Sequence, residues 1–363
     1  MVRFNSNEVL RKFDIKGKLL ECELYGCGHI NDTYKVVVLD DGGNKSYIIQ
    51  RVNTNIFSNI DGLMDNIVGV TEFIKNRISS LGGDISRCMS VIKTIDSESY
   101  AKTSDGCFRC YNFINDAISI ESAPTLEQLR IAGEGIGRFQ RYLDGYPQEK
   151  LVETIPDFHN TESRYNKFLD AINADVVSRR ESIEEEIEFF LVRKHYASKV
   201  LSLIKSGEIP LRVTHNDTKI NNILIDLEHG NAVAVIDLDT VMPGSVVYDF
   251  GDSIRFGANT GAEDEKDLKK VSFSLESFKY FSLGFLSEVK DILLPVELNN
   301  LAFGAILMTY ECGMRFLTDY LEGDKYFKTH RIGHNLDRAR TQIKMIKDME
   351  ANISLMEDII NNA

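Results

Sequence analysis

The sequence has no tryptophan and little positive charge. Its 363 residues include 42 lysines and arginines against 55 aspartates and glutamates, so the net charge is −13. Nucleic-acid binding depends on clustered lysine and arginine, and the acidic balance therefore argues against a nucleic-acid partner. The missing tryptophan weighs against a quaternary ammonium ligand such as choline, because the aromatic cages that bind such cations favour this ring.

Long hydrophobic runs are also absent. The longest, at residues 301–308, is much shorter than the roughly 20 apolar residues of a membrane-spanning helix. Residues 1–20 contain neither the apolar region nor the small-residue cleavage site of a secretory signal peptide. We therefore expect a cytoplasmic protein without a membrane partner, and the sequence does not indicate its oligomeric state.

Cysteine is scarce and scattered. The sequence has six cysteines, and only Cys107 and Cys110 form a C-x-x-C motif, with no second pair that would complete a zinc site. The residues around them alternate in polarity like a strand. We interpret both thiols as reduced and structural, which agrees with a cytoplasmic location.

The first third of the chain reads as strands with one helix. Strands are expected at residues 18–25, 32–39 and 45–52. A turn of Asp and Gly at residues 40–44 predicts a hairpin between the last two strands. Apolar residues then recur at three- and four-residue steps over residues 60–81, which predicts an amphipathic helix. A further hairpin turns at residues 104–106.

The remainder of the chain is mostly helical in pattern. Helices are expected at residues 126–143, 181–204, 275–289, 295–321 and 335–360, with a β-rich stretch at residues 211–239. A change in composition near residues 115–125 is the best domain boundary. The sequence thus predicts an α+β protein, with a small antiparallel-sheet lobe at residues 1–115 and a larger, mainly helical lobe at residues 116–363.

The strongest chemical signal lies in the β-rich stretch. Residues 214–224 read THNDTKINNIL and contain H-x-D-x-x-x-x-N between apolar, strand-like residues. In phosphoryl transfer this spacing lets the Asp, here Asp217, accept the proton of the acceptor hydroxyl, while the Asn, here Asn222, reaches a Mg²⁺ ion. Taken alone, the pattern is also compatible with a surface turn rich in Asn.

A pair of carboxylates follows this loop. The strand at residues 232–236 ends in Asp237-Leu238-Asp239, and carboxylates at such a point suit Mg²⁺, a hard cation that prefers oxygen ligands. Asp237 lies 20 residues after Asp217, the interval expected for a kinase metal ligand. An Asx turn or a helix cap would also explain the pair, and for Asp239 this explanation stays open.

The sequence also spells D-F-G at residues 249–251, the motif that carries a metal ligand in protein kinases. Its Asp249 lies 32 residues after Asp217, too far for that role. We interpret Asp249 as structural, a buried acceptor that holds the loop of Asp217.

A glycine-containing segment lies near the N-terminus. Residues 25–34 read YGCGHINDTY between two predicted strands. Gly26 and Gly28 would let a loop approach phosphates closely, with backbone N–H groups as donors. An ordinary hairpin turn is the simpler reading of these glycines alone, and the position ahead of Asp217 and Asp237 favours the phosphate loop.

With these motifs together, the chain resembles the aminoglycoside/choline kinase superfamily, and within it the N-acetylhexosamine 1-kinases. The stretches that carry the resemblance are residues 25–34, 211–224, 236–244, 249–257, 311–316 and 319–324. The resemblance implies a two-lobed, protein-kinase-like fold. It also implies ATP- and Mg²⁺-dependent phosphorylation of the anomeric (C1) hydroxyl of N-acetylglucosamine or N-acetylgalactosamine.

The resemblance further implies site residues. Asp217 would be the base for the sugar hydroxyl, with Asn222 and Asp237 as Mg²⁺ ligands. The expected nucleotide-binding residues are Gly26, Gly28, Asn31, Thr33, Gln50 and, at the hinge that reads adenine, Asn112 and Ile114. The expected substrate-binding residues are Asp217, Asp239, Arg315 and Tyr326.

Two of these residues could instead have a purely structural role. Arg315 occupies an otherwise apolar helix, where a charge needs a partner, and an ion pair with Glu311 one turn earlier would also explain it. An aromatic residue near a helix end, such as Tyr326, is often there for packing.

One position departs from the protein-kinase pattern. Protein kinases carry a Lys on the third strand that pairs with phosphate, and Gln50 stands there in this chain. Gln donates a hydrogen bond but carries no charge, so the sequence is also compatible with a nucleotide-binding protein without turnover. The intact set of Asp217, Asn222 and Asp237 argues against it.

The same motifs are compatible with two further activities. One is a kinase of another metabolite, and Asp319, Glu322 and Asp324 would offer an acidic pocket to an aminoglycoside. The other is a metal-dependent hydrolase, suggested by His215 near Asp217, although such sites usually recruit more His ligands.

Overall fold

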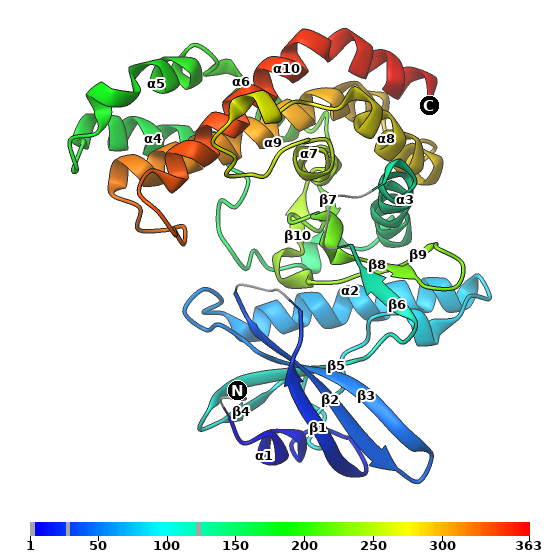
Figure 1. The fold of residues 1–363 in the computed structure, drawn as a ribbon. Coiled ribbons are helices and arrows are strands. Elements are labelled where there is room, and N and C mark those ends of the chain that lie inside the picture. The colour runs from blue at the N-terminus through cyan, green and yellow to red at the C-terminus, as the bar shows by residue number, and fades with distance from the viewer. Residues whose placement is uncertain (1–3, 27–29, 121–124) are drawn as a thin grey trace. The chain divides into compact units, whose positions relative to one another are not determined.

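The structure, a computed structural model, describes residues 4–26, 30–120 and 125–363 and shows an α+β chain (Figure 1). The chain forms two units. Unit 1 comprises Met1–Ile118, Gly145–Ile155 and Leu224–Pro243, and unit 2 comprises Ser119–Asp144, Pro156–Ile223 and Gly244–Ala363. Unit 1 holds an antiparallel sheet of five strands, and unit 2 is mainly helical. The α+β class predicted from the sequence is confirmed.

The helices are α1 (Ser6–Leu10), α2 (Ile60–Ser80), α3 (Leu126–Leu143), α4 (Thr161–Ala174), α5 (Glu184–Leu191), α6 (His195–Lys205), α7 (Val246–Gly257), α8 (Leu275–Val289), α9 (Pro295–Glu322) and α10 (His334–Asn362). The strands are β1 (Lys18–Leu24), β2 (Asp32–Asp40), β3 (Gly43–Arg51), β4 (Ala101–Thr103), β5 (Gly106–Asn112), β6 (Ala117–Ser119), β7 (Arg212–Thr214), β8 (Ile223–Asp226), β9 (Ala232–Val235) and β10 (Met242–Gly244).

The five-stranded sheet of unit 1 has the order β1-β2-β3-β5-β4. The predicted hairpin joins β2 to β3, with Asp40 paired to Gly43. Gly43 has φ +106°, a conformation that glycine adopts without steric cost. The register between β3 and β5 pairs Gln50 with Arg109, so these two polar residues are direct neighbours on adjacent strands.

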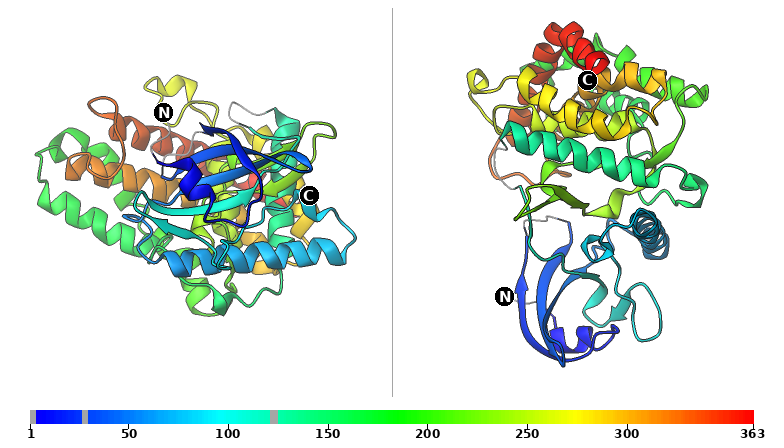
Figure 2. Two further views of the ribbon diagram at one scale, coloured as in Figure 1. Left: turned by 90° about the horizontal axis from the view of Figure 1, so that it is seen from below. Right: turned by 90° about the vertical axis from the view of Figure 1, so that its right-hand side faces the viewer.

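The core of unit 1 follows from the alternation of β2. Tyr34, Val36 and Val38 are fully buried, as expected for every second residue of a strand with one face on the core. Helix α2 runs alongside the sheet (Figure 2) and buries a stripe that includes Leu63 and Ile67. Its amphipathic pattern is recognisable in the sequence because it repeats along the length of the helix.

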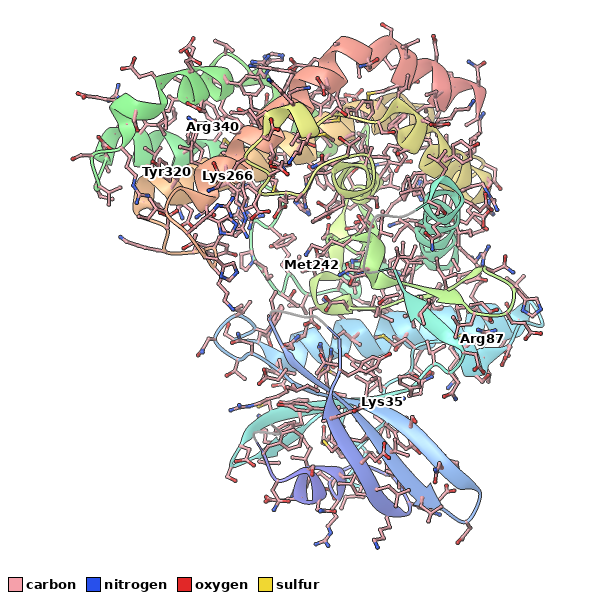
Figure 3. The ribbon with its side chains drawn as sticks, in the orientation of Figure 1. Lys35, Arg87, Met242, Lys266, Tyr320 and Arg340 are labelled. Atoms are coloured by element: carbon pink, nitrogen blue, oxygen red, sulfur yellow. The ribbon has the colours of Figure 1, made fainter. Side chains whose placement is uncertain are left out.

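Unit 1 also contains most of the smaller sheet β6-β8-β9. The turn from β8 to β9 is held by the Asp226 carboxylate, which accepts hydrogen bonds from the backbone N–H groups of Glu228 (2.8 Å) and His229 (2.5 Å). The same carboxylate forms an ion pair with Arg87, which is labelled in Figure 3. Hydrogen bonding, chiefly from the His229 N–H and then from Arg87, lowers the pKa of Asp226 to about 2.

These contacts predict a pH dependence of stability. Because the pKa of Asp226 in the folded chain lies below its ordinary value of 3.8, its contribution is complete above that value and is lost as the pH falls toward 2. We expect Asp226→Asn to lower the urea midpoint of unfolding at pH 6, and the gap to wild type to narrow at pH 3. A gap of equal size at both pH values would contradict this role.

Unit 2 is built from long helices packed in pairs. Helix α3 packs against α8, and α9 packs against both α7 and α10, as Figure 1 shows for α9 and α10. Gly251 of α7 faces Gly304 of α9 so closely that a Cβ at Gly251 would overlap the Gly304 carbonyl. This close crossing fixes α7, the helix that carries Asp249.

Some elements differ from the sequence prediction. The single helix expected at residues 181–204 is two helices, α5 and α6, with a break at residues 192–194 that no Pro or Gly marks. The sequence pattern does not predict helices α4 and α7. Ten consecutive residues of α7, from Val246 to Arg255, are buried, so the helix lacks the polar face that would reveal its period.

The structure also bears on two features of the composition, the short hydrophobic runs and the scattered cysteines. No helix among residues 4–26, 30–120 and 125–363 has the length and apolar composition needed to cross a membrane. The five cysteines that the structure describes are free thiols. Cys110 is fully buried, and burial raises the pKa of its thiol, which fits the structural role predicted for it.

Candidate active site

The predicted catalytic loop follows β7 in unit 2 and leads to β8. Asn216 has φ +64°, and this turn in the backbone leaves the next side chain, Asp217, 26% exposed while its neighbours are buried. Both Asp217 oxygens accept from the Lys219 ammonium group, at 2.9 and 3.1 Å. Asp217 is therefore an accessible carboxylate on a loop that is otherwise packed into the unit.

Asn222 lies in the same loop and supports it. Its amide nitrogen donates to the Asp217 carbonyl oxygen at 2.9 Å. Because the nitrogen is used in this way, the amide oxygen is the atom through which Asn222 can bind a cation. The spacing that predicts a common role for Asp217 and Asn222 thus corresponds to a direct contact.

Asp249 of helix α7 holds the predicted catalytic loop. Its carboxylate accepts hydrogen bonds from the backbone N–H groups of His215 (2.8 Å) and Asn216 (2.7 Å) and from the Gln140 side chain (2.7 Å). The Thr218 hydroxyl donates to the Asp249 carbonyl oxygen at 2.5 Å. Burial raises the pKa of Asp249, and the backbone donors oppose that rise. The interpretation of Asp249 as a buried acceptor is confirmed.

The second carboxylate segment lies in unit 1, just after β9. Asp237 has φ +62° and ψ +57°, a left-handed conformation that few residues other than Gly adopt. Asp239 is buried, and its carboxylate pairs with the Arg109 guanidinium at 2.5 Å and accepts from the Asn31 amide at 2.5 Å. Both Asp239 oxygens are thus engaged inside unit 1.

The structure describes only part of the nucleotide-binding loop that is predicted near the N-terminus. Gly26 has φ +75° and open space around the Cβ position, so glycine is required there by backbone conformation. Gly28 lies outside the described residues. The Thr33 hydroxyl accepts from the Gln50 amide at 3.0 Å, and the Asn31 side-chain carbonyl accepts from the Asn53 backbone N–H at 2.9 Å. Asn31, Thr33 and Gln50 therefore cluster with Asp239 in unit 1.

The predicted hinge residues also lie in unit 1. The Asn112 side chain accepts from the Ser90 N–H (2.7 Å) and donates to the Cys88 carbonyl (2.9 Å). Its side chain therefore holds the neighbouring loop, which leaves backbone groups as the means by which this segment would read adenine. Ile114 is buried.

A pocket in unit 2 contains two of the substrate-binding candidates, Arg315 and Tyr326. Its lining residues are Arg164, Lys167, Arg315, Thr318, Asp319, Glu322, Tyr326 and Phe327. The Arg315 guanidinium lies 5.9 Å from the centre of the Tyr326 ring and 5.5 Å from that of Phe327. Tyr326 is 71% exposed, which is more than packing at a helix end would leave.

The ion pair considered for Arg315 is not formed. The two Glu311 oxygens accept instead from His159 (3.0 Å) and the Thr161 hydroxyl (2.6 Å). Burial first, and then the neighbouring Arg315 guanidinium, lower the pKa of Arg164. Within the described part of the chain neither Arg164 nor Arg315 forms an ion pair with a carboxylate.

Asp319 and Glu322, which line this pocket, and the nearby Asp324 already have partners. Asp319 accepts from three backbone N–H groups, at residues 325–327, and from the Asn335 amide. Glu322 pairs with Lys167 at 3.3 Å, and Asp324 pairs with Arg179 at 2.6 Å. The pocket thus presents guanidinium groups and aromatic rings, and the two carboxylates in its lining, Asp319 and Glu322, are already bonded, Glu322 to Lys167 of the same lining.

Comparison with known proteins identifies the family. A model of the phosphotransferase enzyme family (APH) matches residues 76–277, which is more than half of the chain. The chain belongs to this phosphotransferase family. The matched region includes the predicted catalytic loop, Asp237 and Asp249.

Solved structures similar to the phosphotransferase cover nearly the whole chain. An aminoglycoside phosphotransferase from Alicyclobacillus acidocaldarius aligns with a TM-score of 0.61 at 11% identity, over 100% of this chain and 98% of that one. A choline kinase from Cryptosporidium parvum aligns at 0.54 and 14% identity, over 94% and 92%. The GDP complex of aminoglycoside 2′-phosphotransferase-IIIa aligns at 0.52 and 13% identity, over 91% and 94%. These likenesses confirm the kinase-like fold.

Two residues of the phosphotransferase have side-chain oxygen atoms of the kind that bind a magnesium ion. The candidate ligands are the amide oxygen of Asn222, whose nitrogen is already bonded, and the carboxylate of Asp237. Both are hard oxygen donors, and Mg²⁺ usually takes one or two such protein ligands and completes its shell with phosphate oxygens and water. The donor types therefore fit the ion, and the assignment stays a prediction.

Sequence reasoning missed three charged residues of the phosphotransferase: Arg109, Arg164 and Lys219. Lys219 alone has a local signal, because it lies two positions after Asp217 in the same motif. Burial lowers the pKa of Lys219, but the interaction with the Asp217 carboxylate raises it by more, so the net shift of the pKa is upward. Arg109 pairs with Asp239, and Arg164 lies beside Arg315. Both neighbours are distant in the sequence, so no local pattern predicts either position.

Proposed function

We propose that this phosphotransferase transfers the γ-phosphoryl group of ATP to the anomeric hydroxyl of an N-acetylhexosamine. The observation that carries the proposal is the pocket in unit 2, where Arg164 and Arg315 lack carboxylate partners beside the rings of Tyr326 and Phe327. Among the stretches of sequence that resemble N-acetylhexosamine 1-kinases, residues 311–316 include Arg315, and residues 319–324 end shortly before Tyr326 and Phe327.

The chemistry of the pocket favours a neutral, oxygen-rich acceptor. Guanidinium groups donate hydrogen bonds to carbonyl and hydroxyl oxygens, which an acetamido sugar presents in number, while aromatic side chains offer apolar faces to the ring. A cationic acceptor would be repelled by Arg164 and Arg315. It would also find Asp319 and Glu322 already bonded, which weighs against an aminoglycoside or an amino alcohol.

The catalytic roles follow from the loop. Asp217 would orient the C1 hydroxyl and accept its proton as the sugar oxygen bonds to the γ-phosphorus and the bond from that phosphorus to the β–γ bridging oxygen breaks, releasing ADP. Asn222 and Asp237 would hold Mg²⁺, which when bound offsets negative charge on the phosphates. Lys219, paired with Asp217, would hold the carboxylate in position before substrate binds.

The nucleotide would bind to unit 1. The loop at Gly26 and the strand residues Asn31 and Thr33 belong to the segment expected to cover the phosphates. The related aminoglycoside 2′-phosphotransferase-IIIa was solved with GDP, which supports a nucleoside phosphate as the ligand of this fold. ATP as the donor remains part of the proposal.

A matched pair of acceptors tests the proposal. ATP consumption with Mg²⁺ is measured with N-acetylglucosamine and with glucosamine, which carries a cationic ammonium group in place of the acetamide. N-acetylgalactosamine, glucose, choline and kanamycin complete the panel. We expect turnover with the N-acetyl sugars and little with glucosamine, choline or kanamycin. A clear preference for a cationic acceptor would overturn the reading of the pocket.

A variant separates acceptor binding from nucleotide binding. We expect Arg315→Ala to raise the acceptor KM about tenfold, or about 1.4 kcal/mol, and to leave the KM of MgATP within about twofold. Arg340→Ala is the matched control, because Arg340 pairs with Glu186 on the surface of the same unit. Equal effects of the two substitutions would remove Arg315 from the acceptor site.

A further inference from the structure

Unit 1 contains a buried cation beside the position where protein kinases carry a lysine. Arg109 of β5 is only 1% exposed, and the sheet register pairs it with Gln50 of β3. Its Nε donates to the Gln50 amide oxygen at 2.9 Å. The positive charge missing from residue 50 is thus present on the adjacent strand.

Arg109 connects separate segments of the unit. One side of its guanidinium pairs with Asp239 at 2.5 Å, in the segment that also carries Asp237. Through Gln50, whose amide nitrogen donates to the Thr33 hydroxyl at 3.0 Å, it reaches β2. Asp239 in turn accepts from Asn31, directly before β2. The network therefore starts and ends at the proposed phosphate-covering segment.

The charges in this network are strongly interdependent. A fully buried guanidinium or carboxylate is costly without a partner, and Arg109 and Asp239 are each the other's counter-charge. The planar guanidinium also lies 5.4 Å from the centre of the Tyr111 ring. Arg presents several donors in a fixed geometry, so Arg109 can bond Asp239 and Gln50 together, whereas a Lys at residue 50 has a single charged point.

We propose that Arg109 is the positioning residue that replaces the absent strand lysine: it fixes Asp239, and with it the Asp237 segment, against the nucleotide-covering residues Asn31 and Thr33. Arg109 acts through these residues and does not itself contact the nucleotide. The proposal rests on the proposed function only in taking a magnesium nucleotide as the ligand of unit 1, and it is independent of the acceptor.

Moving the positive charge from residue 109 to residue 50 tests the proposal. Three variants are compared: Gln50→Lys, Arg109→Gln and the double variant. The readouts are the Tm of the nucleotide-free protein and the Kd of a magnesium complex of a non-hydrolysable ATP analogue. We expect each single substitution to weaken binding about tenfold and the double variant to recover to within about threefold of wild type, because one cation again faces Asp239.

The opposite results would overturn it. Tighter nucleotide binding by Gln50→Lys would mean that residue 50 lacks a lysine contact that Arg109 does not replace. Additive losses in the double variant would mean that Gln50 and Arg109 do not share a function. A wild-type protein that binds no nucleotide would instead sink the proposed function, so the two failures are distinguishable.

A second pair of substitutions covers the case in which Arg109→Gln does not fold. Arg109→Gln combined with Asp239→Asn replaces the ion pair by two neutral amides and leaves no unpaired buried charge. We expect the Tm to return toward wild type while nucleotide binding stays weakened about tenfold. Recovery of both the Tm and the Kd would reduce Arg109 to a structural ion pair and contradict the positioning role.

Discussion

Asp217→Asn is expected to lower kcat by about 10²–10⁴-fold, the usual contribution of a general base. Asn keeps the size of Asp217 and can still accept a hydrogen bond, but it cannot take the proton of the acceptor hydroxyl. Nucleotide binding should change little, because the residues proposed for it lie in unit 1. Steady-state kinetics with saturating MgATP, together with nucleotide titration, measures both quantities.

The control for this variant is Asp358→Asn, an exposed carboxylate on α10, which should leave kcat unchanged. Asp217→Asn also removes the charge that pairs with Lys219, so the Tm of both variants is compared with that of wild type. Turnover by Asp217→Asn close to the wild-type rate, with folding intact, would exclude the proposed base.

Asp249→Asn is expected to destabilise unit 2 by about 2–4 kcal/mol and to reduce kcat with it. The carboxylate receives three N–H donors, two of them from the backbone of the catalytic loop. An amide presents one oxygen, and its own N–H₂ would face a donor that it cannot satisfy. The loss therefore displaces the backbone at His215 and Asn216, next to Asp217.

The comparison variant is Gln140→Met, which removes the side-chain donor and keeps both backbone bonds. We expect it to cost about 1 kcal/mol and to leave kcat nearly unchanged. Urea unfolding and kinetics at a temperature where both variants are folded provide the readouts. An Asp249→Asn protein with wild-type stability would show that the buried carboxyl is protonated, contrary to a role as a charged acceptor.

The elements that the sequence predicts best are those with clear ends and one apolar face. Helices α3 and α8 have the predicted bounds, and each begins after a residue whose hydroxyl caps the first turn, Thr125 and Ser274. Helix α4 also follows a capping residue, Asn160, so attention to caps would find it. Helix α7 has no alternation of apolar and polar faces in its sequence, because it is buried on nearly all sides.

The site is predictable to the extent that its residues are close in sequence. The spacing of Asp217 and Asn222 indicates a shared loop, and the distance to Asp249 indicates a structural acceptor. Arg109 is not predictable, because its partner Asp239 is adjacent only in the folded chain. Within unit 2, Arg164 is not predictable for the same reason. It lies on α4 and comes close to Arg315 of α9 only because the two helices pack together.

The bonding partners of the polar residues in the pocket also determine which class of acceptor the pocket would suit. From sequence, Asp319, Glu322 and Asp324 offer an acidic pocket, and Arg315 offers an ion pair with Glu311. In the structure these carboxylates bond to other partners. Arg315 consequently retains its donors, which supports the proposed neutral acceptor over the cationic alternative.

The most direct test of the proposed function is ³¹P NMR of the product formed from MgATP and N-acetylglucosamine. The account predicts a new phosphate monoester whose phosphorus couples to the anomeric proton, together with stoichiometric ADP. A phosphate at another hydroxyl would keep the roles of Asp217, Asn222 and Asp237 but contradict phosphorylation at C1. ATP consumed only with a different class of acceptor would contradict the substrate assignment itself.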